Sequence, residues 1–579
     1  MSLFDWTLVA SSSPFALPSR VHRPWWRDAV VYQIYSRSFA DSNGDGVGDI
    51  EGVRQHLDYL KWLGVDAIWL TPFYDSPWND GGYDVANYRL VDPQVGSNED
   101  VERLIASAHE LGIKVLADIV PNHSSSEHEW FKEAVARGPE SRAAQRYHVV
   151  RGKGVDGDEP PNNWKCVFGG IAWSRFPAPA GGVVPGWWYL HLFDATQPDV
   201  NWDDPDVRAD FIHTLRFWFD RGLDGFRIDV AHGLSKDPTY PDDSEQVARM
   251  ADVEIDDDTQ SLQRPQWDYP GNHDIYRDWR VVADAYEPRR VFCGEVWLPD
   301  PVRQAKYLRR DELHTAFNFH FVYTPWTVAD MRLRIDESLV STRAVGAPQT
   351  WVLSNHDIVR HATRFGKDAD GVIDHDLGLR RAKAITTMMM GLPGSAYIYQ
   401  GEELGLHEVV DLPAEVREDP AFVRTNGEDG YRDGCRVPIP WSGSEPPYGF
   451  SPADAQTWLP QPRSWADVTV AAEQADPAST LHHYRELLRA RKAEPALGDG
   501  PMTWVADAPE GVLAFVRPPH EGDAGVVVAL NVSDKGVAFN GPLLTDEILV
   551  ASDTEVVATA DGIALPANSA VWVRLAAEA

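Results

Sequence analysis

The sequence predicts an α/β fold: a (β/α)8 TIM barrel with an inserted irregular domain after its third strand and a C-terminal antiparallel β-sandwich domain. Three observations support this. Short apolar runs alternate with amphipathic segments about eight times, which is typical of a parallel sheet covered by helices. Between about 121 and 200, many Gly, Pro and Trp residues interrupt the alternation. Beyond about residue 498, short β-patterned runs indicate a separate antiparallel domain.

The predicted barrel strands are eight apolar runs bounded by polar or turn residues. They are residues 29–39, 65–72, 112–120, 222–230, 290–297, 315–321, 349–353 and 395–400. Apolar residues at helical spacing predict barrel helices at 98–111, 205–221 and 379–390. Longer insertions are expected after the seventh strand, at 359–379, and after the eighth, at 405–460.

These patterns divide the chain into four parts. An N-terminal lead covers residues 1–28, and the barrel comprises residues 29–120 and 201–497. The inserted domain covers 121–200, and the C-terminal β domain covers 498–579.

The formal charge of -35 argues against nucleic acids and anionic membranes as partners, because both require cationic surfaces. Cys166, Cys293 and Cys435 are too few and too scattered for a disulfide framework or a zinc site. Residues 1–20 lack the pattern of a secretory signal, and no apolar run approaches the ~20 residues that span a bilayer. We therefore expect a cytoplasmic protein. The sequence does not choose between a monomer and a homodimer.

The stretch 225–230 holds an Arg and an Asp two residues apart in an otherwise apolar run. Alternate residues of a strand share a face, so Arg227 and Asp229 are expected to point into one cavity. The guanidinium would keep Asp229 ionised at neutral pH, as a covalent nucleophile requires. A structural ion pair gives the same local pattern, so other carboxylates must decide between the two interpretations.

Acidic residues recur where the predicted strands end. Asp229, Glu295 and Asp357 follow the fourth, fifth and seventh strands, and the C-terminal ends of barrel strands build the active site in this architecture. Because like charges close together are unfavourable, at least one carboxyl group must retain a proton. One ionised carboxylate beside one protonated carboxyl group is the pair that retaining glycoside hydrolysis uses.

Four segments together resemble the signature regions of the α-amylase superfamily, glycoside hydrolase family 13. They are ADIVPNH (117–123), GFRIDVAH (225–232), GEVW (294–297) and SNHD (354–357), and they occur in the family's order. QPDVN (197–201) resembles the fifth region of the α-glucosidase and oligo-1,6-glucosidase branch. The resemblance covers about residues 28–500 and implies a glycoside hydrolase with the barrel fold.

The resemblance implies a role for each matched residue. Asp229 is the expected nucleophile and Glu295 the general acid and base, while Asp357 binds sugar hydroxyls more tightly in the transition state. His123 and His356 are expected to donate hydrogen bonds to the glucosyl ring. For either histidine alone, a structural role explains the residue equally well.

Further matches imply that one end of the sugar site is closed. Asp80 and Tyr83 resemble the Asp and the stacking Tyr that grip a terminal glucose, and Phe168 resembles an apolar wall of the same subsite. Arg432 resembles an Arg that pairs with Asp80, and Arg436 is the alternative for that position. An Asp–Arg pair across one end implies a blind pocket and therefore exo-action on short substrates.

A possible metal loop follows the first strand. Side-chain oxygens recur at Asp41, Asn43, Asp45 and Asp49, and Val47 would contribute its carbonyl. The spacing resembles an EF-hand loop but lacks the Glu at the twelfth position. Related α-glucosidases carry a similar loop, so a structural Ca²⁺ or Mg²⁺ ion is expected here.

Taken together, the resemblance implies a retaining exo-α-glucosidase that acts on a small oligosaccharide and releases α-D-glucose from its non-reducing end. Maltose and malto-oligosaccharides are the expected substrates, with isomaltose as a further candidate. In the related family a Val after the nucleophile, here Val230, often accompanies α-1,6 cleavage. The following Ala231, His232 and Gly233 depart from the oligo-1,6-glucosidase pattern, so the linkage is open. Two alternatives remain: a glucosyl transferase or isomerase such as trehalose synthase, and a non-catalytic binding protein of the same fold.

Overall fold

The computed structural model describes residues 23–244, 264–452, 455–519, 524–540, 544–560 and 562–575. Most of the predicted N-terminal lead, up to residue 22, lies outside the described residues.

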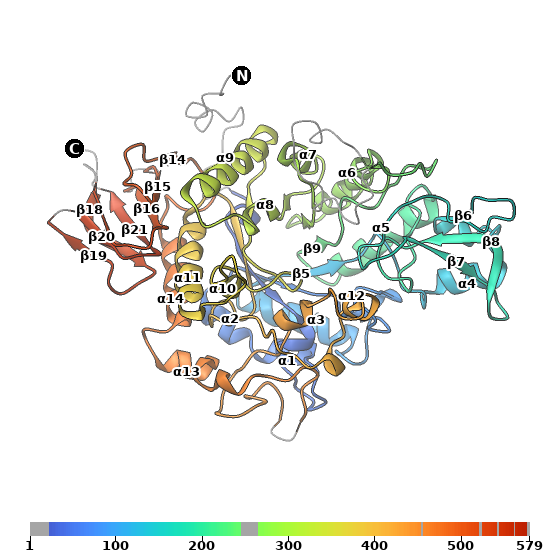
Figure 1. Ribbon diagram of the computed structural model, residues 1–579, viewed down its shortest axis with the longest axis horizontal. Helices are drawn as coiled ribbons and strands as arrows, with labels where there is room; N and C mark the ends of the chain where they lie inside the picture. Colours follow the sequence, from blue (N-terminus) through green and yellow to red (C-terminus); the bar gives the residue numbers. More distant parts are fainter. Residues whose placement is uncertain are drawn as a thin grey trace.

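Eight parallel strands form a nearly closed barrel (Figure 1). Their order is β11-β10-β9-β5-β2-β1-β13-β12, and a parallel bridge between Phe317 and Thr350 joins the two ends of the sheet. The strands are β1 (Val30–Ile34), β2 (Ala67–Leu70), β5 (Lys114–Ile119), β9 (Gly225–Ile228), β10 (Val291–Gly294), β11 (Thr315–Ala316), β12 (Thr350–Trp351) and β13 (Ser395–Tyr399). Each lies within its predicted run, so the predicted barrel is confirmed.

Side-chain caps set where the main helices begin. Ser97 and Asp100 form a capping box at the start of α3, and Asp204 caps α5 just before Pro205. The helices are α1 (Ile50–Gln55), α2 (Leu57–Leu63), α3 (Asn98–Glu110), α4 (Glu129–Arg137), α5 (Pro205–Phe219), α6 (Gly271–Asp284), α7 (Pro301–Lys306), α8 (Phe319–Val322), α9 (Val328–Val345), α10 (His361–Arg364), α11 (His375–Gly391), α12 (Pro420–Arg424), α13 (Val470–Ala475) and α14 (Thr480–Ala493).

The first strand is shorter than predicted. The run 29–39 leaves the sheet after Ile34, and a 3-10 turn follows at Ser36–Ser38. The amide and hydroxyl of Ser36 bond to Thr71 instead of extending the strand ladder. This turn brings the chain over the C-terminal end of the barrel.

Two later segments also differ from their predictions. The sixth strand occupies only two residues of 315–321, because the Asn318 side chain accepts a hydrogen bond from the Phe321 amide and starts α8. The predicted insertion 359–379 contains α10 and the first turn of α11. Asp374 caps α11 and starts it four residues earlier than its apolar spacing predicted.

An antiparallel sheet is inserted between β5 and α5. It pairs β6 (Val149–Arg151), β8 (Val183–Leu190) and β7 (Trp173–Pro177), in that order, and α4 precedes it in the chain. In Figure 1 this sheet projects to the right of the barrel. A buried ion pair of 3.0 Å between Lys236 Nζ and Asp199 ties the end of the insertion to the loop after β9.

The C-terminal part consists of a five-stranded and a three-stranded antiparallel sheet, which confirms the predicted β domain. Trp572 packs it against the barrel, since its indole donates to the Thr387 carbonyl of α11 at 2.9 Å. The strands are β14 (Thr503–Trp504), β15 (Val512–Arg517), β16 (Val526–Asn531), β17 (Val537–Phe539), β18 (Leu544–Ala551), β19 (Val557–Thr559), β20 (Gly562–Leu565) and β21 (Ser569–Leu575). A short hairpin of β3 (Tyr74–Asp75) and β4 (Asn87–Val91) lies after β2.

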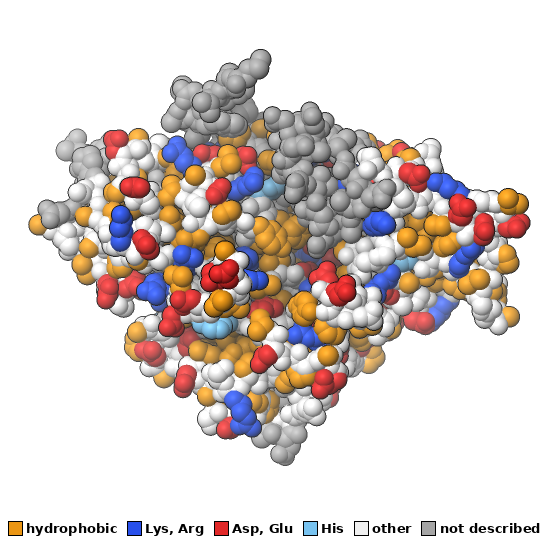
Figure 2. Space-filling view, in the orientation of Figure 1, with side chains coloured by type: hydrophobic (Ala, Val, Ile, Leu, Met, Phe, Trp, Pro, Cys, Tyr) orange, Lys and Arg blue, Asp and Glu red, His pale blue; other side chains and the backbone are white. Residues whose placement is uncertain are grey.

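The surface carries charges of both signs. Figure 2 shows Lys and Arg side chains interspersed with acidic ones on one face of the molecule. None of the helices within the described ranges combines the length and the apolar character needed to cross a membrane.

Candidate active site

The C-terminal ends of four barrel strands bring ionisable side chains together. Asp118 lies near the end of β5, and Arg227 lies on β9 with Asp229 directly after it. Glu295 follows β10, and Asp357 lies in the loop after β12. The parallel register places Asp118 beside Arg227. These positions match the end of the barrel where active sites form.

Arg227 is the centre of this group and is fully buried. Its Nη1 atom donates to both carboxylate oxygens of Asp118, at 3.0 and 3.1 Å, and to Asp229 Oδ1 at 2.7 Å. Its Nη2 atom lies 2.7 Å from Glu295 Oε2. One guanidinium therefore contacts three carboxylates.

The backbone is strained directly after Asp229. Val230 has a φ of 45°, which is unfavourable for a β-branched residue. This conformation directs the Val230 amide to Glu295 Oε2, at 3.0 Å. The Ala231 amide also donates to the Glu295 carbonyl at 2.9 Å, so the strained turn couples Asp229 to Glu295.

Burial controls proton affinity in this group. It raises the pKa of Asp229 well above 3.8, with Arg227 opposing the change and the charges of Glu295 and Asp118 adding to it. Burial also raises the pKa of Asp118 to about 7. Arg227 favours the ionised form of Asp229, as expected from the sequence, but its charge is shared with Asp118 and Glu295. One positive charge faces three carboxylates, so the group retains at least one proton near neutral pH.

Asp357 has the opposite electrostatic setting. Burial alone would raise its pKa, but the attraction of His356, Arg432 and Arg436 lowers the pKa of Asp357 well below 3.8. Asp357 Oδ1 accepts from Arg432 Nη1 at 3.0 Å and from Arg436 Nη2 at 2.8 Å. Asp357 is thus an ionised carboxylate at neutral pH.

Arg432 is the arginine that pairs with Asp80, at 3.1 Å from Nη2 to Oδ1. Its Nε and Nη2 atoms also donate to the buried Asp419, at 3.0 and 2.9 Å. Arg436 instead donates to the His356 carbonyl at 2.8 Å. The two arginines that the sequence could not separate thus occupy different places, and Arg432 bridges Asp80 and Asp357.

Tyr83 and His356 stack face to face, with ring centroids 5.3 Å apart and planes 5° apart. The Tyr83 hydroxyl donates to Asp118 at 2.9 Å. Burial lowers the pKa of His356 well below 6.5, so its ring is neutral. Gln33 Nε2 lies 2.7 Å from its Nδ1 atom, which leaves the Nε2 hydrogen for Asp357 Oδ2 at 3.1 Å.

His123 and Phe168 adjoin the same residues. His123 Nε2 lies 3.2 Å from the Tyr83 carbonyl, and burial lowers the pKa of His123 to about 4. The guanidinium of Arg432 lies over the Phe168 ring, 5.0 Å from its centroid. Segments from the barrel and from the insertion thus surround one site.

Residues 33–500 match the family profile of the α-amylase catalytic domain. The chain belongs to the α-amylase family. The family assignment made from the four sequence segments is therefore confirmed, and the protein is a glycoside hydrolase.

Curated relatives of this α-amylase family member differ in specificity. A probable α-glucosidase of Rhizobium meliloti (strain 1021) is 38% identical over 96% of this chain and 98% of its own length. An oligo-1,6-glucosidase of Parageobacillus thermoglucosidasius is 33% identical over 92% and 95%. A trehalose-6-phosphate hydrolase of Bacillus subtilis (strain 168) is 32% identical over 90% and 91%.

Solved structures show the same architecture. An α-glucosyl transfer enzyme superposes with a TM-score of 0.82 at 35% identity and covers 96% of this chain and 100% of its own. The trehalulose synthase of Pseudomonas mesoacidophila MX-45 superposes with a TM-score of 0.81 at 31% identity, covering 95% and 99%. Hydrolases and glucosyl-transferring enzymes thus share this fold.

Some residues of the site had no predicted role. Asp118 was visible at a strand end, but its bonds to Arg227 and Tyr83 depend on the sheet register. Asp419 lies far along the chain as the N-cap of α12, and its Asp-Pro pattern marks a helix start but not a bond to Arg432. Trp297 follows Glu295 by two residues, a spacing that could have indicated a shared face.

In the predicted metal loop, three of the four side chains expected as ligands accept hydrogen bonds from backbone amides further along the loop. Asp41, Asn43 and Asp45 each accept the amide two residues ahead, at 2.9 to 3.0 Å. Asp49 differs, because its oxygens cap α1 and accept from Ser42. Within the described ranges, no three His, Cys, Asp or Glu side chains are grouped as metal ligands. A cation here would need amide and carbonyl oxygens as well, so the metal stays a prediction.

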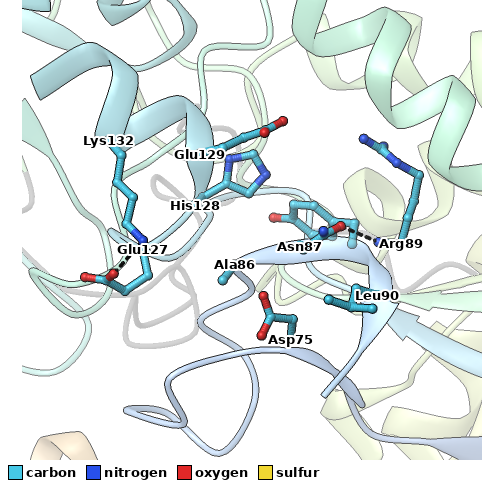
Figure 3. A pocket seen from close by; sticks show the side chains of 10 residues that line it. Asp75, Ala86, Asn87, Arg89, Leu90, Glu127, His128, Glu129 and Lys132 are labelled. Atoms are coloured by element: carbon cyan, nitrogen blue, oxygen red, sulfur yellow. Dashed lines mark hydrogen bonds and ion pairs between the residues drawn. The ribbon is translucent and has the colours of Figure 1, made fainter. Parts of the chain in front are cut away.

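A separate cavity of about 440 Å³ lies where β4 meets the start of α4 (Figure 3). Figure 3 shows His128 between Glu129 and Asn87, with Lys132 paired to Glu127 at one side. The lining residues are Asp75, Ala86, Asn87, Tyr88, Arg89, Leu90, Glu127, His128, Glu129 and Lys132. Among the described residues, none of those predicted for the active site lines this cavity.

Proposed function

We propose that this enzyme is a retaining exo-acting α-glucosidase that releases α-D-glucose from the non-reducing end of maltose and short malto-oligosaccharides, with isomaltose as a further candidate. The observation that carries the proposal is the bridge of Arg432 from Asp80 to Asp357. This bridge joins charged groups on the side of the site where Tyr83 and His356 stack. A terminal sugar fits such a closed end, whereas an internal sugar of a long chain would need an open one.

The proposed mechanism uses two carboxyl groups. Asp229 attacks the anomeric carbon and forms a β-glucosyl ester, while Glu295 gives its proton to the leaving glycosidic oxygen. Glu295 then takes a proton from water, whose oxygen displaces Asp229 and releases α-D-glucose. Both carboxylates touch the same guanidinium. This closeness favours the short separation of about 5–5.5 Å found in retaining enzymes.

Substrate turnover tests this proposal directly. The purified enzyme should release glucose from maltose and maltotriose, with isomaltose, sucrose, trehalose, trehalose 6-phosphate and starch compared in parallel. Chromatography should show glucose as the first product and only slow attack on starch. Rapid internal cleavage of starch, or no release of glucose from any α-glucoside, would contradict exo-α-glucosidase action.

A second candidate is glucosyl transfer or isomerisation at the same site, in the manner of a trehalose synthase. The likeness to an α-glucosyl transfer enzyme favours it. Transfer requires only that a sugar hydroxyl, rather than water, attacks the glucosyl ester. Trehalose formed from maltose without free glucose would select isomerisation. Longer oligosaccharides formed with one glucose released per transfer would select transfer, because hydrolysis instead gives two glucose molecules per maltose.

We also propose that the loop formed by Asp41, Asn43, Asp45, Val47 and Asp49 binds a structural Ca²⁺ or Mg²⁺ ion. Hard cations take carboxylate, amide and carbonyl oxygens of this kind. Gly46 has a φ of 90°, and a Cβ there would lie 2.0 Å from the Gln456 carbonyl, so the sharp turn needs glycine.

Millimolar Ca²⁺ should raise the melting temperature, and EDTA should reverse the effect, because an ion bound only by the folded state adds stability. A ligand present at about 100 times its Kd adds about 2.7 kcal/mol. Differential scanning calorimetry checks this. Asp45→Ala should remove the response, whereas Asp58→Ala, an exposed carboxylate on α2, should keep it. An unchanged melting temperature with both Ca²⁺ and Mg²⁺ would refute the site.

The proposed setting of the enzyme is the cytoplasm, where it would act on small oligosaccharides. A relative, the trehalulose synthase, has been solved with sucrose as its substrate. We propose a monomer or a homodimer, which size-exclusion chromatography with light scattering would separate.

A further inference from the structure

The two carboxylate oxygens of Glu295 have different donors. Oε2 accepts from the Val230 amide at 3.0 Å, and Arg227 Nη2 lies 2.7 Å from it. Oε1 accepts from the indole Nε1 of Trp297 at 2.9 Å. The Glu295 side chain is only 8% exposed, so these neighbours rather than water set its orientation.

Only Oε1 can carry the proton of a general acid in this arrangement. A hydroxyl group at Oε2 would face a backbone N–H and a guanidinium, which are both donors. Such a proton would find no acceptor there and would be repelled by the guanidinium charge. Oε1 faces a single neutral N–H, so it has a free position for the proton. Oε1, which accepts from the Trp297 indole, is therefore the oxygen that carries the acidic proton and gives it to the leaving group.

The Trp297 ring is held by a rigid support. It stacks on Phe319, with ring centroids 3.5 Å apart and planes 10° apart. Phe319 is the buried first residue of α8 and belongs to the apolar cluster inside the barrel. The Glu295 backbone is fixed as well, since its amide donates to the Ile228 carbonyl at 2.9 Å. Both ends of the indole–carboxylate bond are thus anchored.

We propose that Trp297 is a positioning residue whose indole N–H orients Glu295 Oε1 so that its proton points to the leaving glycosidic oxygen. The inference rests on the proposed function. When the bond from C1 to the leaving oxygen breaks, the Oε1 proton moves to that oxygen and an Asp229 oxygen bonds to C1. Water later returns a proton to Oε1 as its oxygen replaces Asp229 at C1.

Trp297→Phe tests this role, because phenylalanine keeps a ring against Phe319 but has no N–H. Three substrates are compared by kcat/KM, which reports the glycosylation step. Maltose and methyl α-glucoside both need protonation of a poor leaving group, and each should lose about 10-fold to 100-fold, the scale of a hydrogen bond to a charged group. α-Glucosyl fluoride needs little acid assistance, so it should change by about 2-fold or less.

The same experiment separates other roles for Trp297. A loss confined to maltose would mean that the ring binds the second sugar, which would overturn the proposal. An equal loss on all three substrates would indicate general damage to the site and would also overturn it. Trp504→Phe is a matched control, since Trp504 on β14 of the C-terminal domain donates to Asp336 of α9 at 2.7 Å, and it should change none of the rates.

The wild-type rates distinguish failure of the positioning role from failure of the proposed function. If the wild type hydrolyses maltose and α-glucosyl fluoride but the Trp297→Phe ratio between them is unchanged, the positioning role fails and the proposed function stands. If the wild type hydrolyses none of the three substrates, the proposed function fails and the positioning role fails with it.

Discussion

Asp229→Asn should abolish turnover of maltose and of α-glucosyl fluoride alike, by about 10,000-fold or more, the scale found when one member of a catalytic set is removed. The amide keeps the shape of the side chain but cannot attack the anomeric carbon as a carboxylate does. Because the loss concerns the nucleophile, it should not depend on the leaving group. Steady-state rates measure the loss. Intact-mass spectrometry with a slow fluorinated glucoside should trap a glucosyl ester on the wild type only.

Asp274→Asn is the matched control for this variant. Asp274 has an exposed side chain on α6. Among the described residues, its ion pair is with Arg277, one turn further along the same helix. It should retain wild-type kcat/KM. An Asp229→Asn enzyme that is folded by circular dichroism and keeps wild-type turnover would show that Asp229 is not the nucleophile.

Arg227→Met should lower the free energy of unfolding by about 3–5 kcal/mol at neutral pH, the cost of removing one partner from a buried ion pair. Arg227 is fully buried and contacts Asp118, Asp229 and Glu295. Without it, three carboxylates would share a buried site with no cation between them. Activity should fall as well, because Asp229 would be protonated more often.

The loss of stability in this variant should depend on pH. Arg227 lowers the folded-state pKa of Asp118 and of Asp229, which burial raises, so removing the guanidinium raises both pKa values further above their unfolded values. A carboxyl group with a raised folded pKa binds more protons when folded, so stability falls as pH rises through the interval between the two values. Urea unfolding should therefore show a smaller deficit near pH 5 than near pH 8. Arg137→Met, an exposed residue of α4, serves as the control, and equal deficits at both pH values would contradict this account.

Residues adjacent in sequence could be assigned without a structure. Local periodicity places Arg227 and Asp229 two residues apart at the end of one strand. It also places Glu295 just after the next strand. Parallel barrel strands bring their C-terminal ends together, so these residues were predicted to meet. The structure places both carboxylates on Arg227.

The sequence by itself thus determined the barrel, the family and the convergence of Asp229, Glu295 and Asp357, because strand period and strand order act over short stretches of chain. Tertiary structure alone decided which arginine meets Asp80, since Arg432 lies 352 residues away along the chain. It also decided that Asp118 is a third carboxylate on Arg227 and that Phe319 supports Trp297. Contacts of this kind depend on register and on loop conformation, which long-range packing sets and local composition does not encode.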